Sequence, residues 1–413
     1  MPSTLPDGDE PPRDGGLPPT AVAGVGQRPF GVYLHVPFCA SRCGYCDFNT
    51  YTPSELGGRT DPAAYLDAAE AELRLMATVL GDHAVPARTV FVGGGTPTLL
   101  GAAGLTRLLD AVRSTIGLAD GAEVTTEANP ESVDPAMLVA LRAAGFTRIS
   151  FGMQSASSRI LGVLDRRHTP GRALEAAREA RAAGFAHINL DLIYGTPGET
   201  DADWRASLEA ALSVAPDHVS AYALIVEDGT RFAARVSRGE LPMPDDDVLA
   251  DRYLIADEML GAAGLGWYEV SNWAAGRDAR CLHNELYWTG ADWWGVGPGA
   301  HSHVGGVRWW NVKHPAVYAE RLAAAASPAQ ARETLTPAER YDEDVLLRVR
   351  LSDGIPVTAL AAPSRAAVAG LVADGLVDAD AAAGGSLVLT RAGRLLADGV
   401  VRTLLTQRDT ARR

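Results

Sequence analysis

The sequence predicts an α/β protein built on a partial six-stranded (β/α) barrel, followed by an α+β accessory region and a small winged-helix-like C-terminal domain. Three observations predict this fold. Short apolar segments alternate with helical segments of about 10 to 15 residues, which indicates parallel βαβ units. Glycines and polar residues follow the apolar segments, as they do at the loop-bearing end of such a barrel. From about Ser327 the composition shifts to alanine-rich helical stretches.

The composition excludes several classes of protein. The 413 residues, of which 47% are apolar, suffice for a barrel and smaller domains. A formal net charge of −14 argues against non-specific nucleic-acid binding. No apolar run reaches the roughly 18 to 20 residues of a membrane span, and residues 1–28 lack the pattern of a signal peptide. We therefore expect a cytoplasmic protein with a disordered leader over 1–28 and at most peripheral membrane contact.

The first predicted strand, 31–36, leads directly into a group of cysteines. Cys39, Cys43 and Cys46 have the spacing CxxxCxxC, and the chain has only one other cysteine. So few cysteines argue against a disulfide framework, and no second ligand pair for zinc lies nearby. Thiolates are the usual ligands of iron–sulfur clusters. We expect a [4Fe-4S] cluster with one open iron, with zinc or a structural role as the alternatives.

The barrel repeat follows this loop. Apolar spacing predicts a helix over 62–80 with Asp61 as its N-cap, then a buried strand over 88–92 that ends in GGGTP. Six strands in all are expected, two fewer than in a closed eight-stranded barrel, so one side can admit a large substrate. The remaining helix and strand pairs are predicted at 104–116 and 122–128, 134–144 and 147–152, 171–183 and 186–193, and 203–214 and 217–224.

Polar side chains stand at the ends of three successive predicted strands, namely Glu127, Gln154 and Asp191. A buried unpaired charge is costly, so packing alone does not explain them. Each could cap a neighbouring loop. Together, at the end where the cysteine loop emerges, they favour a shared ligand. The glycines at 93–95 would let the backbone approach that ligand closely.

Five ordered motifs make the chain resemble a known family. Over about residues 30–310, their combination is similar to radical S-adenosylmethionine (SAM) proteins of the oxygen-independent coproporphyrinogen dehydrogenase group. The resemblance implies a partial (β/α)6 radical SAM barrel, in agreement with the six predicted strands. The motifs are CxxxCxxC at 39–46, GGGTP at 93–97, EANP at 127–130, FGMQS at 151–155 and DLIYGTPG at 191–198.

The resemblance also implies a use for the open iron. SAM would bind it through amino and carboxylate groups, and one electron would cleave SAM to a 5′-deoxyadenosyl radical, so that the protein supplies position and electrostatics. No residue is assigned a catalytic role. The contacts implied by the resemblance are Gly94, Gly95 and Thr96 with the methionyl part, Tyr33 and Tyr45 beside the cluster and nucleoside, Gln154, Arg166 (or its neighbour Arg167) and Asp191 with ribose or carboxylate groups, and Glu127 with a neighbouring site.

Two features separate two branches of this group. The dehydrogenases resemble CxxxCxxCxC, whereas this chain has Phe48 at the position of the last cysteine. The segment 283–288, HNELYW, matches the HNxxYW signature of the HemW-type haem chaperones. Such proteins are implied to bind haem as cargo and deliver it to apo-haemoproteins such as respiratory enzymes. We therefore expect a haem chaperone, with coproporphyrinogen III dehydrogenase activity in porphyrin biosynthesis as the alternative; whether the chain forms a homodimer stays open.

His283 is the candidate haem ligand, because a neutral imidazole is a common axial ligand. Tyr287 and Trp288 could supply flat apolar surface. The alternative is that His283 caps a loop and the aromatic residues pack an interdomain core. Cys281 could also reach haem as a thiolate, although a lone cysteine is more often buried and inert. Residues 295–300, GVGPGA, follow no strand that feeds a helix, so we interpret them as a close-packing turn beneath HNxxYW.

These predictions divide the chain into four parts. The last contains predicted helices at 337–350, near 356–374 and from Ala392, with a wing at 376–377 and 387–389. It has no concentrated basic helix, which argues against DNA binding and favours contact with a client protein or with the barrel opening. The parts are the leader at 1–28, the radical SAM partial barrel at 29–240, the accessory region containing HNxxYW at 241–326, and the winged-helix-like domain at 327–413.

Overall fold

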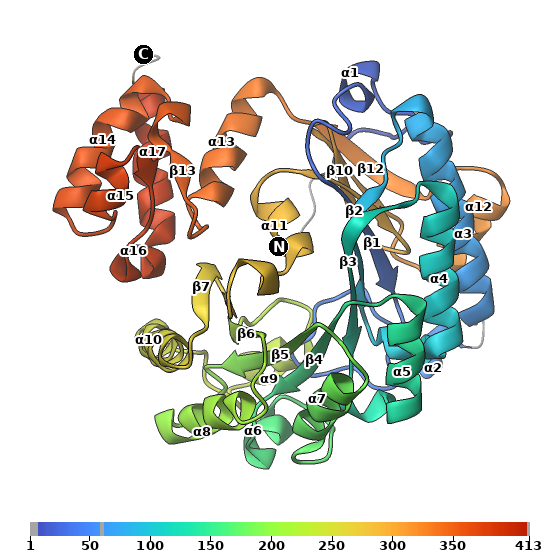
Figure 1. The fold of residues 1–413 in the computed structure, drawn as a ribbon, viewed down its shortest axis with the longest axis horizontal. Coiled ribbons are helices and arrows are strands. Elements are labelled where there is room, and N and C mark those ends of the chain that lie inside the picture. The colour runs from blue at the N-terminus through green and yellow to red at the C-terminus, as the bar shows by residue number, and fades with distance from the viewer. Residues whose placement is uncertain (1–6, 58–61, 411–413) are drawn as a thin grey trace.

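A computed structural model describes residues 7–57 and 62–410, and Asp61, the expected N-cap, lies outside these ranges. Within them, twelve strands form one mixed sheet in the order β12-β11-β10-β9-β1-β2-β3-β4-β5-β6-β8-β7 (Figure 1). None of the described helices is both long enough and apolar enough to cross a membrane.

Six consecutive parallel strands form the centre of the sheet, as predicted. Helices cover their outer face, and the inner face lines the partial barrel (Figure 1). The strands are β1 (Phe30–Val36), β2 (Ala87–Gly94), β3 (Leu118–Ala128), β4 (Arg148–Gln154), β5 (His187–Tyr194) and β6 (His218–Ala223). The connecting helices are α2 (Pro53–Leu56), α3 (Pro62–Leu80), α4 (Gly101–Thr115), α5 (Pro135–Ala144), α6 (Ser158–Val163), α7 (Arg172–Ala182) and α8 (Asp201–Leu212).

The alternation of side chains along β1 explains how the barrel is packed. Val32, Leu34 and Val36 are fully buried in the outer core with the helices. The residues between them, Tyr33 and His35, therefore point to the inner face. This period of two recurs in the other strands and places polar side chains inside the barrel.

The accessory region extends the barrel sheet on both sides. On one side β9 (Asp292–Val296) runs parallel to β1 and is followed by antiparallel β10 (His301–Val304), β11 (Val307–Asn311) and β12 (Ala329–Thr334). On the other side β8 (Asn272–Ala274) and β7 (Gly266–Glu269) continue from β6. The predicted boundary at 327 thus falls before the last strand of this sheet. The helices of this region are α9 (Arg231–Ser237), α10 (Asp246–Ala262), α11 (Leu282–Trp288) and α12 (Pro315–Ala323).

The prediction of a disordered leader is wrong for residues 7–28. Asp9 exchanges two backbone hydrogen bonds with Arg332, which covers the outer edge of β12. Helix α1 (Pro19–Val22) buries Ala21 and Val22 against the protein. The Pro/Gly-rich composition hid these few apolar anchors and the free sheet edge that the leader pairs with. Residues 1–6, the rest of the predicted leader, lie outside the described residues.

The C-terminal part has a hydrophobic core of its own and lies to one side of the barrel (Figure 1). Short strands β13 (Ile355–Pro356) and β14 (Ser386–Leu387) pair antiparallel, and Val377 bridges to Leu389 as the predicted wing requires. The winged-helix assignment stays a prediction. The helices are α13 (Pro337–Arg348), α14 (Ala362–Ala373), α15 (Ala379–Ala383), α16 (Arg391–Leu395) and α17 (Ala397–Thr410).

Candidate functional site at the barrel mouth

The cysteine loop leaves the carboxyl end of β1 and is tied to the glycine segment after β2. The Cys39 N–H donates to the Tyr51 carbonyl at 3.0 Å, which closes the loop. The Gly95 N–H donates to the Val36 carbonyl at 2.8 Å, and the Thr96 N–H donates to the Phe38 carbonyl at 2.7 Å. The structure therefore brings two motifs that are far apart in sequence into direct contact.

The three loop cysteines are free thiols and are partly buried. Burial raises the pKa of Cys39, and it raises the pKa of Cys46 to about 11. Thiolates here consequently need a positive partner, which a metal centre provides. No group of His, Cys, Asp or Glu among the described residues is arranged to hold a single metal ion. Each cysteine of a cluster binds a different iron, so the thiolates of a cluster site need not converge on one point.

Glycine is required at two positions beside this loop. Gly94 has φ +105°, and a Cβ there would lie 2.6 Å from His35 Cε1. A Cβ on Gly95 would lie 2.4 Å from the Phe38 carbonyl oxygen. The Gly94 N–H donates to Glu127 Oε2 at 3.1 Å. The N–H groups of Gly94, Gly95 and Thr96 are therefore already bonded within the protein, and a ligand would meet other atoms of this segment.

Two carboxylates face the inside of the barrel near the loop. Burial, with a further contribution from the charge of Asp191, raises the pKa of Glu127 to about 8. Burial also raises the pKa of Asp191, whose oxygens accept hydrogen bonds from Ser150 and Asn189 at 2.7 Å each. Neither carboxylate pairs with a lysine or arginine among the described residues. This unpaired acidity suits polar ligand groups such as hydroxyls and ammonium.

Arg166, and not its neighbour Arg167, faces the loop. Its Nη1 donates to Cys43 Sγ at 3.5 Å and its Nη2 donates to the Gly152 carbonyl at 2.9 Å, whereas Arg167 is exposed. The buried Nε of Arg166 has no hydrogen-bond partner in the described part of the chain. Buried donors are normally satisfied, so this nitrogen is available to an acceptor that enters the site.

Gln154 and Tyr45 complete the predicted set around the loop. Gln154 has φ +65°, which is uncommon for a residue with a side chain, and it follows a register shift between β4 and β5. Such backbone strain is typical of functional sites. Tyr45 packs against a small buried cluster that includes Leu164 and Phe232. The structure therefore gathers most of the predicted site residues at this end of the barrel, whereas the Tyr33 ring lies deeper in β1 and stacks on the His283 ring with centroids 6.2 Å apart.

His283 lies at the opposite end of the strands, where α11 closes the barrel floor. Its Nδ1 lies 2.7 Å from Thr89 Oγ1 and its Nε2 lies 2.8 Å from Tyr287 Oη. The ring stacks on Phe91 with centroids 5.2 Å apart, and the residue is only 1% exposed. Burial lowers the pKa of His283 to about 3. As placed, this imidazole has both nitrogens engaged and cannot also bind iron, so the alternative of a packed aromatic core describes it better.

A buried ion pair holds the floor helix, and sequence reasoning missed it. Glu123 accepts hydrogen bonds from Arg148 Nε at 3.0 Å and from the backbone N–H groups of Leu282 and His283 at 3.2 and 3.1 Å. A signal existed in the sequence. Glu123 is four residues before Glu127 in one strand, so the period of two places both on the inner face.

A second missed element connects β1 to the cysteine loop. Tyr33 Oη lies 3.0 Å from His35 Nδ1, and His35 Nε2 lies 2.9 Å from the Asn49 carbonyl. The Asn49 side chain donates to the carbonyls of Pro298 and Lys313 at 2.9 and 2.8 Å. The GVGPGA turn therefore packs tightly, as predicted, but beside the cysteine loop and not beneath HNxxYW.

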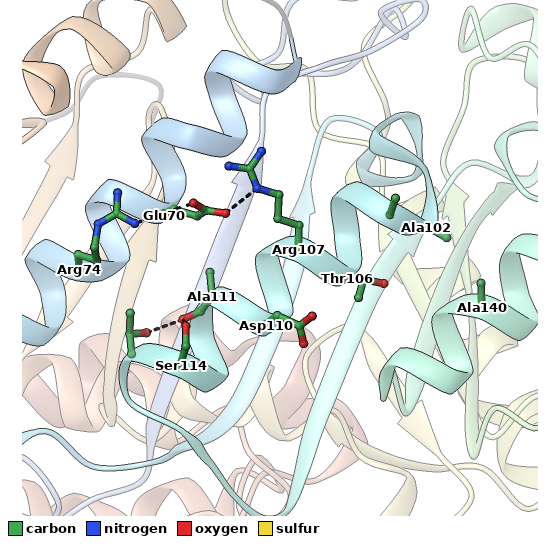
Figure 2. Close-up of a pocket in the computed structure, with 11 residues that line it drawn as sticks. Glu70, Arg74, Ala102, Thr106, Arg107, Asp110, Ala111, Ser114 and Ala140 are labelled. Carbon is green, nitrogen blue, oxygen red and sulfur yellow. Dashed lines mark hydrogen bonds and ion pairs between the residues drawn. The ribbon is translucent and has the colours of Figure 1, made fainter.

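A separate groove lies on the outer helical layer between α3, α4 and α5 (Figure 2). Arg107 crosses it and pairs with Glu70 at 2.6 Å and with Asp67 at 2.5 Å. Its other walls are mostly alanine and short polar side chains, with no histidine, cysteine or aromatic residue among the lining residues. The groove therefore lacks the histidine or cysteine ligand and the flat aromatic surface that a haem site uses.

Comparison with known proteins places these features in a family. The radical SAM superfamily model matches residues 33–211. The chain is 58% identical to the haem chaperone HemW of Mycobacterium tuberculosis over 92% of this chain and 95% of that one. It is 34% identical to HemW of Bacillus subtilis over 78% of this chain and 84% of that one. Coproporphyrinogen III oxidase (HemN) of Escherichia coli, a radical SAM enzyme, has a similar structure, with a TM-score of 0.78, 25% identity, and coverage of 93% of this chain and 92% of that chain.

Proposed function

The chain belongs to the HemW family of radical SAM proteins, and we propose that it binds haem as cargo and delivers it to apo-haemoproteins in the cytoplasm. The observation that carries this proposal is the 58% identity to a protein named as a haem chaperone, which extends over 92% of the chain. The matched length includes the floor helix as well as the barrel. Respiratory enzymes are the class of client we propose.

The resident cofactors of this proposal are a [4Fe-4S] cluster on Cys39, Cys43 and Cys46 and a SAM molecule beside it. Three reduced thiols in one loop, and the unpartnered Arg166 Nε next to Cys43, support this placement. When bound, the pair would supply one-electron chemistry. The residues of the chain hold and orient it.

Each predicted SAM contact has a physical basis in its surroundings. The Arg166 Nε is the donor still available for a carboxylate oxygen. The N–H groups of Gly94, Gly95 and Thr96 are engaged, so an amino group would meet their carbonyls. The remaining contacts we propose are Asp191 and Gln154 with ribose hydroxyls, Tyr33 and Tyr45 beside the cluster and nucleoside, and Glu127 with a neighbouring polar group.

The alternative activity is oxidative decarboxylation of coproporphyrinogen III, which the structural likeness to the Escherichia coli enzyme keeps open. Phe48 opposes it. This side chain is 58% exposed and occupies the position where the dehydrogenase-type motif has its further cysteine. A phenyl ring cannot ligate metal, whereas an exposed ring can contact an apolar cargo or client.

Both activities can be measured on one preparation. The full-length protein is reconstituted anaerobically with iron and sulfide and titrated with haem, and the haem-loaded protein is then mixed with an apo-cytochrome. A second portion is incubated with coproporphyrinogen III, SAM and a reductant. We expect saturable haem binding, transfer to the apo-cytochrome and no protoporphyrinogen. Protoporphyrinogen formation without haem binding would replace the chaperone proposal with the dehydrogenase one.

The cluster assignment has its own test. Cys39→Ser is expected to lose most of the iron and sulfide after reconstitution, because one of three thiolate ligands is removed. Cys281→Ser is the matched control, since Cys281 is buried at the barrel floor beside Glu123, away from the loop. Full iron and sulfide content in Cys39→Ser would refute the cluster site.

A further inference from the structure

The proposed function calls for an axial ligand to haem iron, and three histidines in the described part of the chain have no free ring nitrogen. Like His283, two more have both ring nitrogens engaged: His35 with Tyr33 and Asn49, and His218 with Asn189 and Tyr268. In four others one ring nitrogen is bonded or buried: Nδ1 of His303 contacts the Ala291 carbonyl, Nδ1 of His314 caps α12, and Nδ1 of His168 and of His187 is buried.

His301 differs from these residues. Its imidazole makes no hydrogen bond to any described residue and is partly exposed. The ring stacks on Trp310, with centroids 6.1 Å apart and planes inclined by 27°. Burial lowers the pKa of His301 to about 4, so the ring is neutral at neutral pH and a nitrogen lone pair is free.

The sheet register places His301 on the inner face of the barrel sheet. His301 pairs with Trp310, and His303 pairs with Trp293. Trp293 in turn pairs with Gly31 of β1, two residues before Tyr33. Residues of the opposite face, such as Trp294 and Val304, are packed in the core with the outer helices.

Aromatic rings continue along this face from the HNxxYW segment. Tyr287 packs edge-on against Trp293 with centroids 4.8 Å apart, and Trp293 lies 5.1 Å from the His303 ring. Tyr287 and Trp293 are partly exposed. Flat aromatic surface beside a free imidazole is what a porphyrin needs for stacking and ligation.

A free cation lies beside the same face. Lys313 is the single lysine of the chain, is exposed and makes no ion pair with any described residue. The carbonyl of Val312, the residue before it, accepts a hydrogen bond from the Gly299 N–H at 2.9 Å, which places Lys313 beside the segment that leads into His301. Arg308 also lies on this face but is already paired with Glu333 and Glu343. Lys313 is therefore the group available to a carboxylate.

We propose, on the basis of the proposed function, that haem binds on the inner face of β9, β10 and β11 with His301 as its axial ligand. Trp310 orients the imidazole, Trp293 and Tyr287 contact the porphyrin, and Lys313 pairs with a propionate. Binding forms a dative bond from an imidazole nitrogen to iron and requires no oxidant or reductant. In this arrangement HNxxYW supports the haem face through Tyr287 and does not ligate the metal.

Four proteins test the ligand: wild type, His301→Ala, His283→Ala and His83→Ala. His83 is an exposed histidine in the turn after α3 and is the control. Each protein carries its reconstituted cluster and is titrated anaerobically with haem, with the haem signal taken as the difference from the cluster spectrum. We expect His301→Ala to raise the haem Kd by about 10- to 100-fold, because mutating even a residue that only supports a metal ligand costs this much affinity. His83→Ala should match wild type.

Rescue with imidazole separates ligation from folding. Added imidazole should restore the haem spectrum of His301→Ala, because it can occupy the space of the missing ring, and iron and sulfide content should stay at the wild-type level. Unchanged affinity and spectrum in His301→Ala overturn the proposal but leave the chaperone function intact. The His301 proposal is also overturned, with the chaperone function intact, if only His283→Ala loses the histidine-ligated spectrum and added imidazole restores it. Absence of haem binding in wild type rejects the proposed function itself.

The propionate contact is tested with haem and its dimethyl ester, which lacks the negative charges. Lys313→Gln should weaken haem binding by about 2- to 5-fold, the range of an exposed ion pair, and should leave ester binding unchanged. Lys313→Arg should behave like wild type. Equal losses for haem and ester in Lys313→Gln would remove Lys313 from the site.

Discussion

Glu72 shows how one buried side chain connects the helical layer to the accessory strands. It lies on α3, is 1% exposed, and accepts hydrogen bonds from the Gly297 N–H at 2.8 Å, the Asn311 amide at 2.7 Å and the Tyr318 hydroxyl at 2.5 Å. Burial nevertheless raises its pKa to about 7. The three donors fix its position, and the loss of water dominates its protonation.

The free energy of unfolding should therefore depend on pH through Glu72. Between the unfolded pKa of about 4.5 and the native pKa of about 7, the native state binds more protons, so stability falls as the pH rises. Glu72→Gln removes this dependence. The unfolding free energy of Glu72→Gln minus that of wild type should rise by up to about 3 kcal/mol from pH 5 to pH 8. Urea unfolding at each pH measures this difference.

Other buried carboxylates titrate in the same range, so only the difference between wild type and variant isolates Glu72. Glu199 and Glu269 also have pKa values raised to about 7 by burial. Glu70→Gln is the control, because Glu70 lies on the same helix but pairs with Arg107 at the surface groove. Parallel stability curves for wild type and Glu72→Gln would contradict the linkage.

At the scale of elements, the cysteine loop depends on segments far from it in sequence. Asn49 fixes the loop through hydrogen bonds to the carbonyls of Pro298 and Lys313, and its Oδ1 accepts from the Tyr51 hydroxyl at 3.2 Å. Gly297, with φ +113°, packs so closely on His35 that a Cβ would lie 2.5 Å from its carbonyl oxygen. The accessory strands therefore hold the cysteine loop in place through these contacts.

Asn49→Ala should weaken the attachment of the cysteine loop to the accessory strands without removing a cluster ligand. The variant loses three side-chain hydrogen bonds, each worth about 0.5–1.5 kcal/mol. We expect normal iron content after anaerobic reconstitution and faster bleaching of the cluster absorbance when a chelator is added. Asn129→Ala is a control, since that residue caps a short turn after β3. Equal bleaching rates for Asn49→Ala and wild type would show that these contacts do not protect the cluster.

The elements of the barrel were predictable because each is specified by its own residues. The strand at 31–36 and the helix at 62–80 follow local periodicity, and they correspond to β1 and α3. The parallel pairing of β9 with β1 was not predictable, because no local pattern specifies a partner that is so distant in sequence. The same reason explains why the contacts of the leader with β12 were missed.

Within the site, residue types were easier to predict than orientations. Cys39 is at the barrel mouth because it follows the end of β1, which the sequence reveals, whereas Arg166 lies beyond α6 and only the resemblance predicts its role. His283 was expected near haem from its motif, yet α11 turns its ring into the floor, where Thr89 and Tyr287 bind it. A motif specifies which residues are present; only tertiary packing determines which way they point.

At the scale of the whole molecule, one buried aspartate attaches the C-terminal part to the barrel. Asp257 of α10 accepts hydrogen bonds from Arg394 Nη1 and Nη2 at 2.8 and 2.9 Å, and Arg391 Nε lies 2.7 Å away. The Arg394 guanidinium also lies over the Trp267 ring at 4.5 Å. A second ion pair joins Asp353 to Arg277 near α11.

Asp257→Asn should release the C-terminal helices while the barrel stays folded. Removing one partner of a buried ion pair costs about 3–5 kcal/mol, whereas the exposed Asp353 pair contributes at most about 1 kcal/mol. Hydrogen exchange measured by mass spectrometry should therefore be faster in α16 and α17 of Asp257→Asn and nearly unchanged in Asp353→Asn. Equal exchange in both variants would show that Asp257 does not control docking.

The pairing of β9 with β1 has a consequence for biosynthesis. Phe30 pairs with Asp292, so the outer edge of β1 stays without its native neighbour until most of the chain has been made. At about 5–20 residues per second, this interval lasts roughly tens of seconds. An unpaired edge can join to other chains during that time. Pro298 and Lys313, which hold Asn49, emerge later still, so the loop reaches its final form only late in translation. We therefore expect the proposed cluster to be loaded after that point and not on the early nascent chain.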